Sequence, residues 1–183
     1  MIKFKGHITV LKNETVEAVV QNSVDSKDKF YIDMTFGGGG HCFELLKISE
    51  GSAVIGLDQD PDALNSGKDL ILDENMMNSI LLEKANFVEV ADVLQRRSVK
   101  DFLGKKSFAG CYADLGVSSH QFDVGERGFS FRFDGPLDMR MDPDDEKFES
   151  AEILINEYNQ EDLEKIFKMY GEERFSKRIA EKI

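Results

Sequence analysis

Four consecutive glycines and a later aspartate are the residues of this sequence best suited to hold a small ligand. The glycines, Gly37 to Gly40, follow the short apolar run Tyr31-Ile32, and Asp58 ends the next apolar run. Glycine lets the backbone turn sharply and approach a ligand closely, and an acid about 20 residues further on can accept hydrogen bonds from ribose hydroxyls. The pattern therefore predicts a βαβ unit that binds a cofactor containing a nucleoside.

The same turn bears on the class of cofactor. In the dinucleotide fingerprint, a third glycine allows close packing of helix and strand around a pyrophosphate. Here Cys42 stands at that position in one frame and Phe43 in the other. A cofactor without a pyrophosphate, such as S-adenosylmethionine, does not need that glycine, and Asp58 is placed to bind its ribose. A nicotinamide-dependent oxidoreductase stays open as an alternative, as does an ordinary tight turn with Asp58 as a loop acid.

A second acidic residue, Asp114, ends a later apolar run and opens the polar segment that continues to Ser119. In enzymes that methylate an exocyclic amine, an acceptor at this place orients the nitrogen toward the methyl group of the donor. Such alignment supplies much of the rate, because the donor is already activated. Asp114 is therefore a candidate catalytic residue, although it could instead hold the adenine of the cofactor or cap the following turn.

The segments that must position these residues alternate between strand-like and helix-like patterns. Strands are expected at 29–35, 53–57, 79–84 and 108–115, and helices at 12–21, 41–49, 61–72 and 89–103. The alternation predicts an α/β fold with a parallel sheet and right-handed crossovers. Such sheets bind ligands at the carboxyl ends of their strands, so we expect Asp33, Asp58 and Asp114 there, beside the glycine turn.

The pattern changes after residue 116. Residues 117–148 are rich in Gly, Asp, Phe and Arg and show no periodicity, whereas apolar residues recur at helical spacing from 151 onward. Asn159 is expected to cap one of these helices and Gly171 to end it. No strand-like segment follows the fourth one, so the sheet is expected to be incomplete, and either the chain is a fragment or something else covers that edge.

Three aspartates in the segment 117–148, Asp134, Asp138 and Asp142, recur every four residues. Their spacing does not match a calcium-binding loop, which ends in a glutamate. We interpret them as solvated acids or as partners of Arg132 and Arg140.

Composition excludes some classes of function. The chain has 183 residues, 41% of them apolar, and no apolar run approaches the roughly 18 residues that a membrane span needs, so we expect a cytoplasmic protein without a membrane partner. A net charge of −12 argues against non-specific coating of nucleic acid, but basic residues gather at 96–106 and at 174–182. Two cysteines and three scattered histidines give no metal-binding spacing, and no metal is expected.

Several short motifs occur together in this chain. They read HITVL (7–11), TFGGGGH (35–41), DQDPDA (58–63), DLGVSSHQ (114–121), ERGFSFR (126–132), DGPLDMRMD (134–142) and YGEER (170–174). In this combination the chain resembles the bacterial methyltransferases that modify the N4 amine of a cytidine in 16S ribosomal RNA. The stretch 114–142 is the most specific part of the resemblance.

The resemblance implies a Rossmann-like S-adenosylmethionine-dependent methyltransferase sheet, incomplete here and followed by part of a helical inserted domain. Residues 1–116 would form the N-terminal part of the methyltransferase domain, 117–148 a connecting signature segment, and 149–183 the start of a substrate-recognition insertion. The implied partner is 16S rRNA in the small ribosomal subunit, and the oligomeric state, a homodimer included, stays open. A non-catalytic fragment that binds cofactor or RNA is a further alternative. The implied cofactor contacts are Gly39, Gly40, His41, Asp58, Phe87, Asp114 and Gln121.

Overall fold

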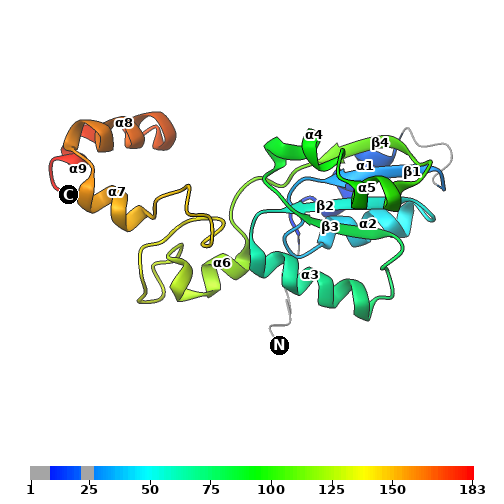
Figure 1. Cartoon of the computed structure of the whole chain (residues 1–183). Coiled ribbons are helices and arrows are strands. Elements are labelled where there is room, and N and C mark those ends of the chain that lie inside the picture. Colours follow the sequence, from blue (N-terminus) through cyan, green and yellow to red (C-terminus); the bar gives the residue numbers. More distant parts are fainter. Residues whose placement is uncertain (1–8, 22–26) are drawn as a thin grey trace. The chain divides into compact units, whose positions relative to one another are not determined.

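The computed structural model describes residues 9–21 and 27–183, and the chain divides into two compact units, Met1–Ser118 and Ser119–Ile183. The first unit is a parallel sheet flanked by helices, and the second is built from short helices and an ordered loop (Figure 1). The elements of the first unit are α1 (Lys12–Val20), β1 (Lys29–Asp33), α2 (Gly40–Ile48), β2 (Ala53–Asp58), α3 (Pro61–Asp73), β3 (Ile80–Lys84), η1 (Phe87–Glu89), α4 (Val90–Val93), α5 (Arg97–Leu103) and β4 (Ser107–Tyr112).

The four strands are all parallel and lie in the order β3-β2-β1-β4. The chain runs outward from β1 through β2 to β3 and then returns to the other side of β1 as β4. The direction of winding therefore reverses between β1 and β4, which is where sheets of this kind bind ligands. The arrangement confirms the expected α/β class and its parallel sheet, with β4 at an edge of the sheet within the described residues.

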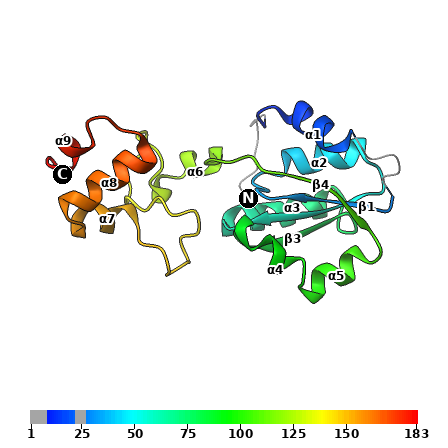
Figure 2. The ribbon, with the colours of Figure 1, turned by 90° about the horizontal axis from the view of Figure 1, so that it is seen from above.

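Helices cover both faces of the sheet. Alternate side chains of each strand point to opposite faces, so each layer of helices packs on its own set of strand side chains. Tyr31 and Val54 belong to a core shared with α1, α2 and α3, whereas Ile32 and Ile55 pack with α4 and α5 on the other face. Figure 2 shows α1 and α2 on one side of the sheet and α4 and α5 on the other. Burial on both faces explains why β2 is apolar at nearly every position.

The helix expected at 89–103 is wrong as a single element, because the structure divides it into α4 and α5. The chain turns between them, and Arg96 has an extended backbone with φ −60° and ψ 141°. Its guanidinium donates to Glu83 Oε2 at 2.6 Å and so ties the turn to β3. A tertiary ion pair therefore accompanies the break in a segment whose apolar spacing alone suggests one helix.

Two strands are shorter than expected. The predicted strand 29–35 ends at Asp33, and the predicted strand 108–115 ends at Tyr112. These two residues face each other in the register of β1 and β4, so the pairing stops at the same level on both strands. Asp114 therefore lies just beyond the strand, in the loop at the rim.

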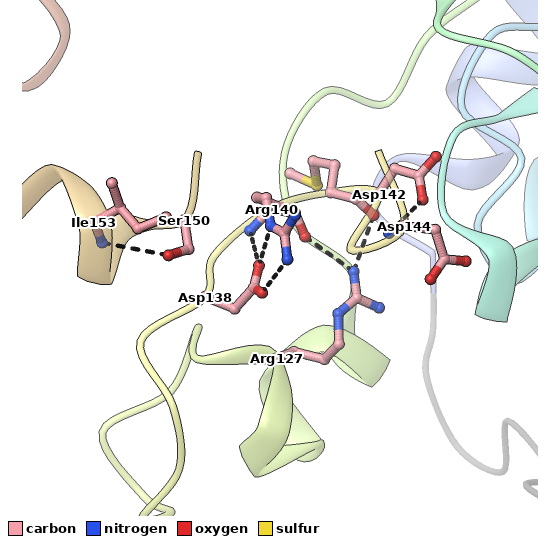
Figure 3. A network of polar contacts seen from close by, with 8 residues as sticks. Arg127, Asp138, Arg140, Asp142, Asp144, Ser150 and Ile153 are labelled. Carbon is pink, nitrogen blue, oxygen red and sulfur yellow. Dashed lines mark hydrogen bonds and ion pairs between the residues drawn. The ribbon is translucent and has the colours of Figure 1, made fainter. Parts of the chain in front are cut away.

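The second unit begins with α6 (Ser119–Asp123) and η2 (Gly125–Arg127), which the sequence analysis did not anticipate. A long loop follows, and Arg127 organises it by donating to the carbonyls of Arg140 and Met141 at 3.1 and 2.9 Å (Figure 3). Arg140 in turn makes a two-pronged contact with Asp138, which confirms one of the expected pairs. Arg132 Nη1 instead lies 3.7 Å from Asp123 Oδ1, so the expected pairing of Arg132 with one of the three regularly spaced aspartates is wrong.

Three helices complete the second unit: α7 (Ala151–Glu157), α8 (Gln160–Gly171) and α9 (Ser176–Ala180). Asn159 caps α8 as expected, because its side chain accepts a hydrogen bond from the Asp162 amide at 3.0 Å. The helix ends at Gly171, but the left-handed residue that follows is Glu172, with φ 49°. None of the helices in the described part of the chain combines the length and apolar character that a membrane crossing requires.

The close packing of α3 on the sheet yields a stability prediction. A Cβ atom at Gly67 would lie 2.5 Å from Phe36 Cε1 and 2.8 Å from Leu82 Cδ1. Gly67→Ala should therefore lower the free energy of unfolding by about 1–3 kcal/mol, although alanine favours a helix by about 1 kcal/mol over glycine. Urea denaturation followed by circular dichroism measures the effect.

The matched control is Asn65→Ala, an exposed position on the same helix where the better helix former should raise stability slightly. A Gly67→Ala protein as stable as the parent would contradict the tight packing of Phe36 beneath α3.

Candidate functional site

The glycine turn is held in place by the strand beside it. The Phe36 amide donates to the Leu57 carbonyl at 2.8 Å, and the Gly39 amide donates to the Phe36 carbonyl at 2.7 Å. Gly37 and Gly39 have φ values of 51° and 73°, a region that residues with a side chain rarely adopt. The turn then leads into α2, which begins at Gly40.

The glycines also make room for the unit's own side chains. A Cβ at Gly39 would lie 2.7 Å from the Phe43 ring and 2.8 Å from the Phe36 ring, and one at Gly40 would clash with the Thr9 hydroxyl. The close approach expected toward a ligand is thus accompanied by a close approach to protein on the other side. Glycine at these two positions has a packing role whatever binds at the rim.

Asp58 is bound directly to the glycine turn. Its Oδ2 accepts a hydrogen bond from the Gly37 amide at 2.8 Å, and its Oδ1 accepts one from the Asp60 amide at 2.9 Å. Burial raises the pKa of the Asp58 carboxyl, while these amide donors lower it in part. Each oxygen accepts one of these bonds and has a second lone pair, so the carboxylate can also accept from the hydroxyls of a ligand.

Phe87 lies on η1, immediately after β3 and next to the end of β2. Asn86 connects the two segments, because its Nδ2 donates to Gln59 Oε1 at 3.0 Å. Asn86 and Glu89 also form a capping box at the start of η1. The Phe87 ring is 37% exposed, so one apolar surface is available near Asp58.

Asp114 meets the glycine-turn segment from the β4 side. Its amide donates to Thr35 Oγ1 at 2.7 Å, and Asp114 itself is exposed. This contact bridges β1 and β4, the pair of strands between which the winding reverses. The carboxylate is therefore presented at the rim and accessible to a ligand.

Asp33 lies beneath this contact and is almost completely buried. Its Oδ1 accepts from the Thr35 amide at 3.1 Å, and its Oδ2 accepts from the Tyr112 hydroxyl at 3.1 Å. Burial raises the pKa of Asp33 from 3.8 to about 7, against the lowering effect of the two donors. Burial likewise raises the pKa values of the Cys42 thiol and the Tyr112 phenol well above their usual range.

His41 is the second residue of α2 and is also buried. Its ring centroid lies 5.6 Å from that of Tyr112. Within the described residues, His41 Nε2 has no hydrogen-bond partner. A buried ring nitrogen without a partner is costly, and it is the kind of group that a bound ligand or an ordered water satisfies.

Gln121 belongs to the second unit, whereas the other expected cofactor contacts lie in the first. It is buried in α6, and its Nε2 lies 3.4 Å from Met141 Sδ. Its expected contact with a cofactor stays a prediction.

The structure thus brings together, in the first unit, six of the seven residues expected to contact the cofactor. Sequence reasoning did not identify the supporting contacts of Thr35, Tyr112 and Asn86. The spacing Asn86-x-x-Glu89 is a sequence signal for the capping contact of Asn86. No local signal marks the other two, because their partners lie across the sheet.

In the described residues no three His, Cys, Asp or Glu side chains converge to hold a metal ion.

The two basic segments differ in their surroundings. In the first, Arg96 pairs with Glu83, and Lys106 donates to the carbonyls of Lys27 and Gly51. In the second, the guanidinium groups of Arg174 and Arg178 lie 5.9 and 5.8 Å from the centroid of the Phe175 ring, which is 54% exposed. The second segment therefore presents an aromatic ring together with two arginines, a combination that suits nucleic acid.

Comparison with known proteins agrees with the motifs. The model of the MraW methylase family matches residues 4–183. Three similar relatives carry the name ribosomal RNA small subunit methyltransferase H. The protein of Symbiobacterium thermophilum is 43% identical over 176 residues, which cover 96% of this chain and 51% of the relative. That of Magnetococcus marinus is 45% identical, covering 95% and 52%. That of Lactobacillus gasseri is 40% identical, covering 100% and 55%.

The chain spans about half the length of these relatives. The family match extends over nearly the whole chain, through both units and across the glycine turn, Asp58 and Asp114. The chain belongs to the MraW methylase family.

Proposed function

We propose that this chain is part of a methyltransferase that uses S-adenosylmethionine to methylate the N4 amine of a cytidine in 16S rRNA of the small ribosomal subunit. The observation that carries the proposal is the hydrogen bond from the Gly37 amide to the Asp58 carboxylate. It joins the glycine turn to the acid expected at the ribose, so both features belong to one rim. The relatives named above support the RNA substrate.

In this proposal, Asp58 accepts hydrogen bonds from the ribose hydroxyls, and Phe87 provides apolar surface for the adenine. The first amide groups of α2, at Gly40 and His41, favour the carboxylate of the cofactor, because the start of a helix carries partial positive charge. The unpartnered His41 Nε2 fits a polar ligand at the same place. Bound there, the cofactor supplies an electrophilic methyl group.

Asp114 is the proposed catalytic residue. Its carboxylate is exposed at the rim, next to the segment that leads into the glycine turn. A carboxylate that accepts a hydrogen bond from the target amine would orient the nitrogen lone pair toward the donor, and orientation of this kind supplies much of the catalysis in group transfer. Gln121, in the second unit, is proposed as a further cofactor contact.

A nicotinamide cofactor suits the turn less well. Cys42, at the place of the third glycine, is completely buried and packs in the core between α2 and the sheet. A pyrophosphate at this turn is favoured by a glycine at that position.

We also propose the division of the chain into 1–116 as methyltransferase domain, 117–148 as signature segment and 149–183 as the start of an RNA-recognition insertion.

The proposed activity is tested with the protein in its full natural length. Incubation with labelled S-adenosylmethionine and unmethylated small subunits should place label in N4-methylcytidine of the 16S rRNA. Asp58→Ala should weaken cofactor binding in calorimetry by about tenfold or more, because a charge-assisted hydrogen bond to the ribose is lost.

The control for charge is Asp69→Ala, an exposed acid on α3, which should leave the cofactor affinity unchanged. Cofactor binding without label transfer would favour the non-catalytic alternative. Fluorescence enhancement of NADH without binding of S-adenosylmethionine would favour the oxidoreductase.

The RNA surface makes a separate prediction. Arg174→Ala combined with Arg178→Ala should weaken RNA binding and reduce its salt dependence, because each lost phosphate contact lowers the slope of log affinity against log salt by about 0.9 in a duplex and 0.7 in a single strand. Arg97→Ala with Lys100→Ala removes the same charge from the first basic segment. An unchanged slope in the first variant, or an equal reduction in the second, would contradict the placement of RNA at this surface.

A further inference from the structure

Asp33 is a buried carboxyl group that the proposed mechanism does not use. It is 1% exposed, and its two hydrogen-bond donors, the Thr35 amide and the Tyr112 hydroxyl, are neutral. In the described part of the chain, no lysine or arginine pairs with it. A buried carboxylate without a cation is unfavourable, because burial penalises the charged form.

The titratable groups around Asp33 increase this penalty. Asp58 on β2 and Asp114 beyond β4 both repel a negative charge at Asp33. Cys42 on α2 and Tyr112 on β4 face Asp33, and His41 on α2 packs against the Tyr112 ring. The groups that interact electrostatically with Asp33 are therefore acids, a thiol and a phenol, and none of them is a lysine or an arginine.

Asp33 is also within one contact of the proposed cofactor site. Thr35 donates to Asp33 through its amide and accepts from the Asp114 amide through its hydroxyl. Tyr112 donates to Asp33 and packs against the ring of His41. A positive charge bound at the rim would thus lie near a carboxyl group that has no cation of its own.

We propose that Asp33 is the counter-charge of the cofactor: at neutral pH it carries a proton in part of the empty pockets and releases that proton when a sulfonium-bearing cofactor binds, with the Tyr112 hydroxyl stabilising the carboxylate. The inference rests on the proposed function. In the step, the O–H bond of the carboxyl breaks, the electron pair stays on the Asp33 oxygen, and the proton passes to the buffer. Asp33 acts as a charge partner from beneath the rim, and Tyr112 is a positioning residue.

The empty protein offers a first prediction. The pKa of Asp33 is about 7 in the folded state against 3.8 as its ordinary value, so the folded state binds this proton more tightly. The stability that Asp33 contributes is complete below pH of about 4 and is lost as the pH rises through about 7. Asp33→Asn, in which Tyr112 can accept from the new amide, lacks this loss. The free energy of unfolding of the variant should therefore rise relative to that of the parent as the pH increases from about 4 through about 7.

The linkage itself is measured by calorimetry of S-adenosylmethionine binding at pH 7, in phosphate and in Tris, whose ionisation enthalpies differ. The parent should release up to about half a proton per site at pH 7, since about half of the Asp33 groups are then protonated. Asp33→Asn should release less, and Asp69→Asn, an exposed control, should match the parent. S-adenosylhomocysteine, which lacks the sulfonium charge, should release less than S-adenosylmethionine from the parent.

Tyr112→Phe provides a second variant that keeps the ring. Without the hydroxyl the carboxylate loses a donor, so the pH at which cofactor affinity rises should move upward. Equal proton release from the parent and Asp33→Asn, or an unshifted pH profile in Tyr112→Phe, would overturn the inference while leaving the cofactor assignment intact. Failure of the parent to bind S-adenosylmethionine would refute the proposed function, and this inference with it.

Discussion

The hydrogen bond between the Gly37 amide and the Asp58 carboxylate is the contact on which the candidate site depends. It exists because β1 and β2 run parallel and β1 ends opposite Gly56, two residues before β2 ends, so the turn that follows β1 passes beside Leu57 and Asp58. Asp58 then accepts backbone amides from both sides, which fixes its orientation despite the cost of burying a carboxylate. A loop acid that merely capped a turn would not need an amide from 21 residues earlier.

The second constraint acts between β1 and β4, where the winding reverses. Two hydrogen bonds cross this boundary, from Tyr112 to Asp33 and from the Asp114 amide to Thr35, each joining residues 79 positions apart. They connect the buried layer below the rim to its exposed surface. The same boundary therefore presents Asp114 to solvent and buries Asp33, and two aspartates of similar sequence context receive opposite environments.

Sequence reasoning predicted the parallel sheet from its alternating patterns, and it predicted the glycine turn, Asp58 and Asp114 at the strand ends because glycine content and strand-terminal acids are local signals. Phe87 and His41 were expected at the site only from the family resemblance. Sequence reasoning failed at the helix 89–103, where the Arg96–Glu83 ion pair accompanies a break that apolar spacing does not reveal. It also could not pair Asp33 with Tyr112 or Thr35 with Asp114, because those two contacts depend on the register of β1 with β4. The loop around Arg127 has no periodicity for the same reason: its order comes from a buried guanidinium that binds carbonyls 13 and 14 residues away.

The charged side chains of the two units suit different ligands. In the first unit, Asp58 and Asp114 lie at the rim and Asp33 lies buried close to both, which favours a cofactor with positive charge and opposes RNA phosphates. The residues suited to phosphate, Arg174 and Arg178, belong to the second unit. A net charge of −12 is compatible with an RNA substrate under this division, because binding depends on where the cations gather rather than on the sum. The acidity is shared by both units, with a net charge of −5 over residues 1–118 and −7 over residues 119–183, so the proposed RNA contact depends on the local group of Arg174, Phe175 and Arg178 and not on the charge of its unit.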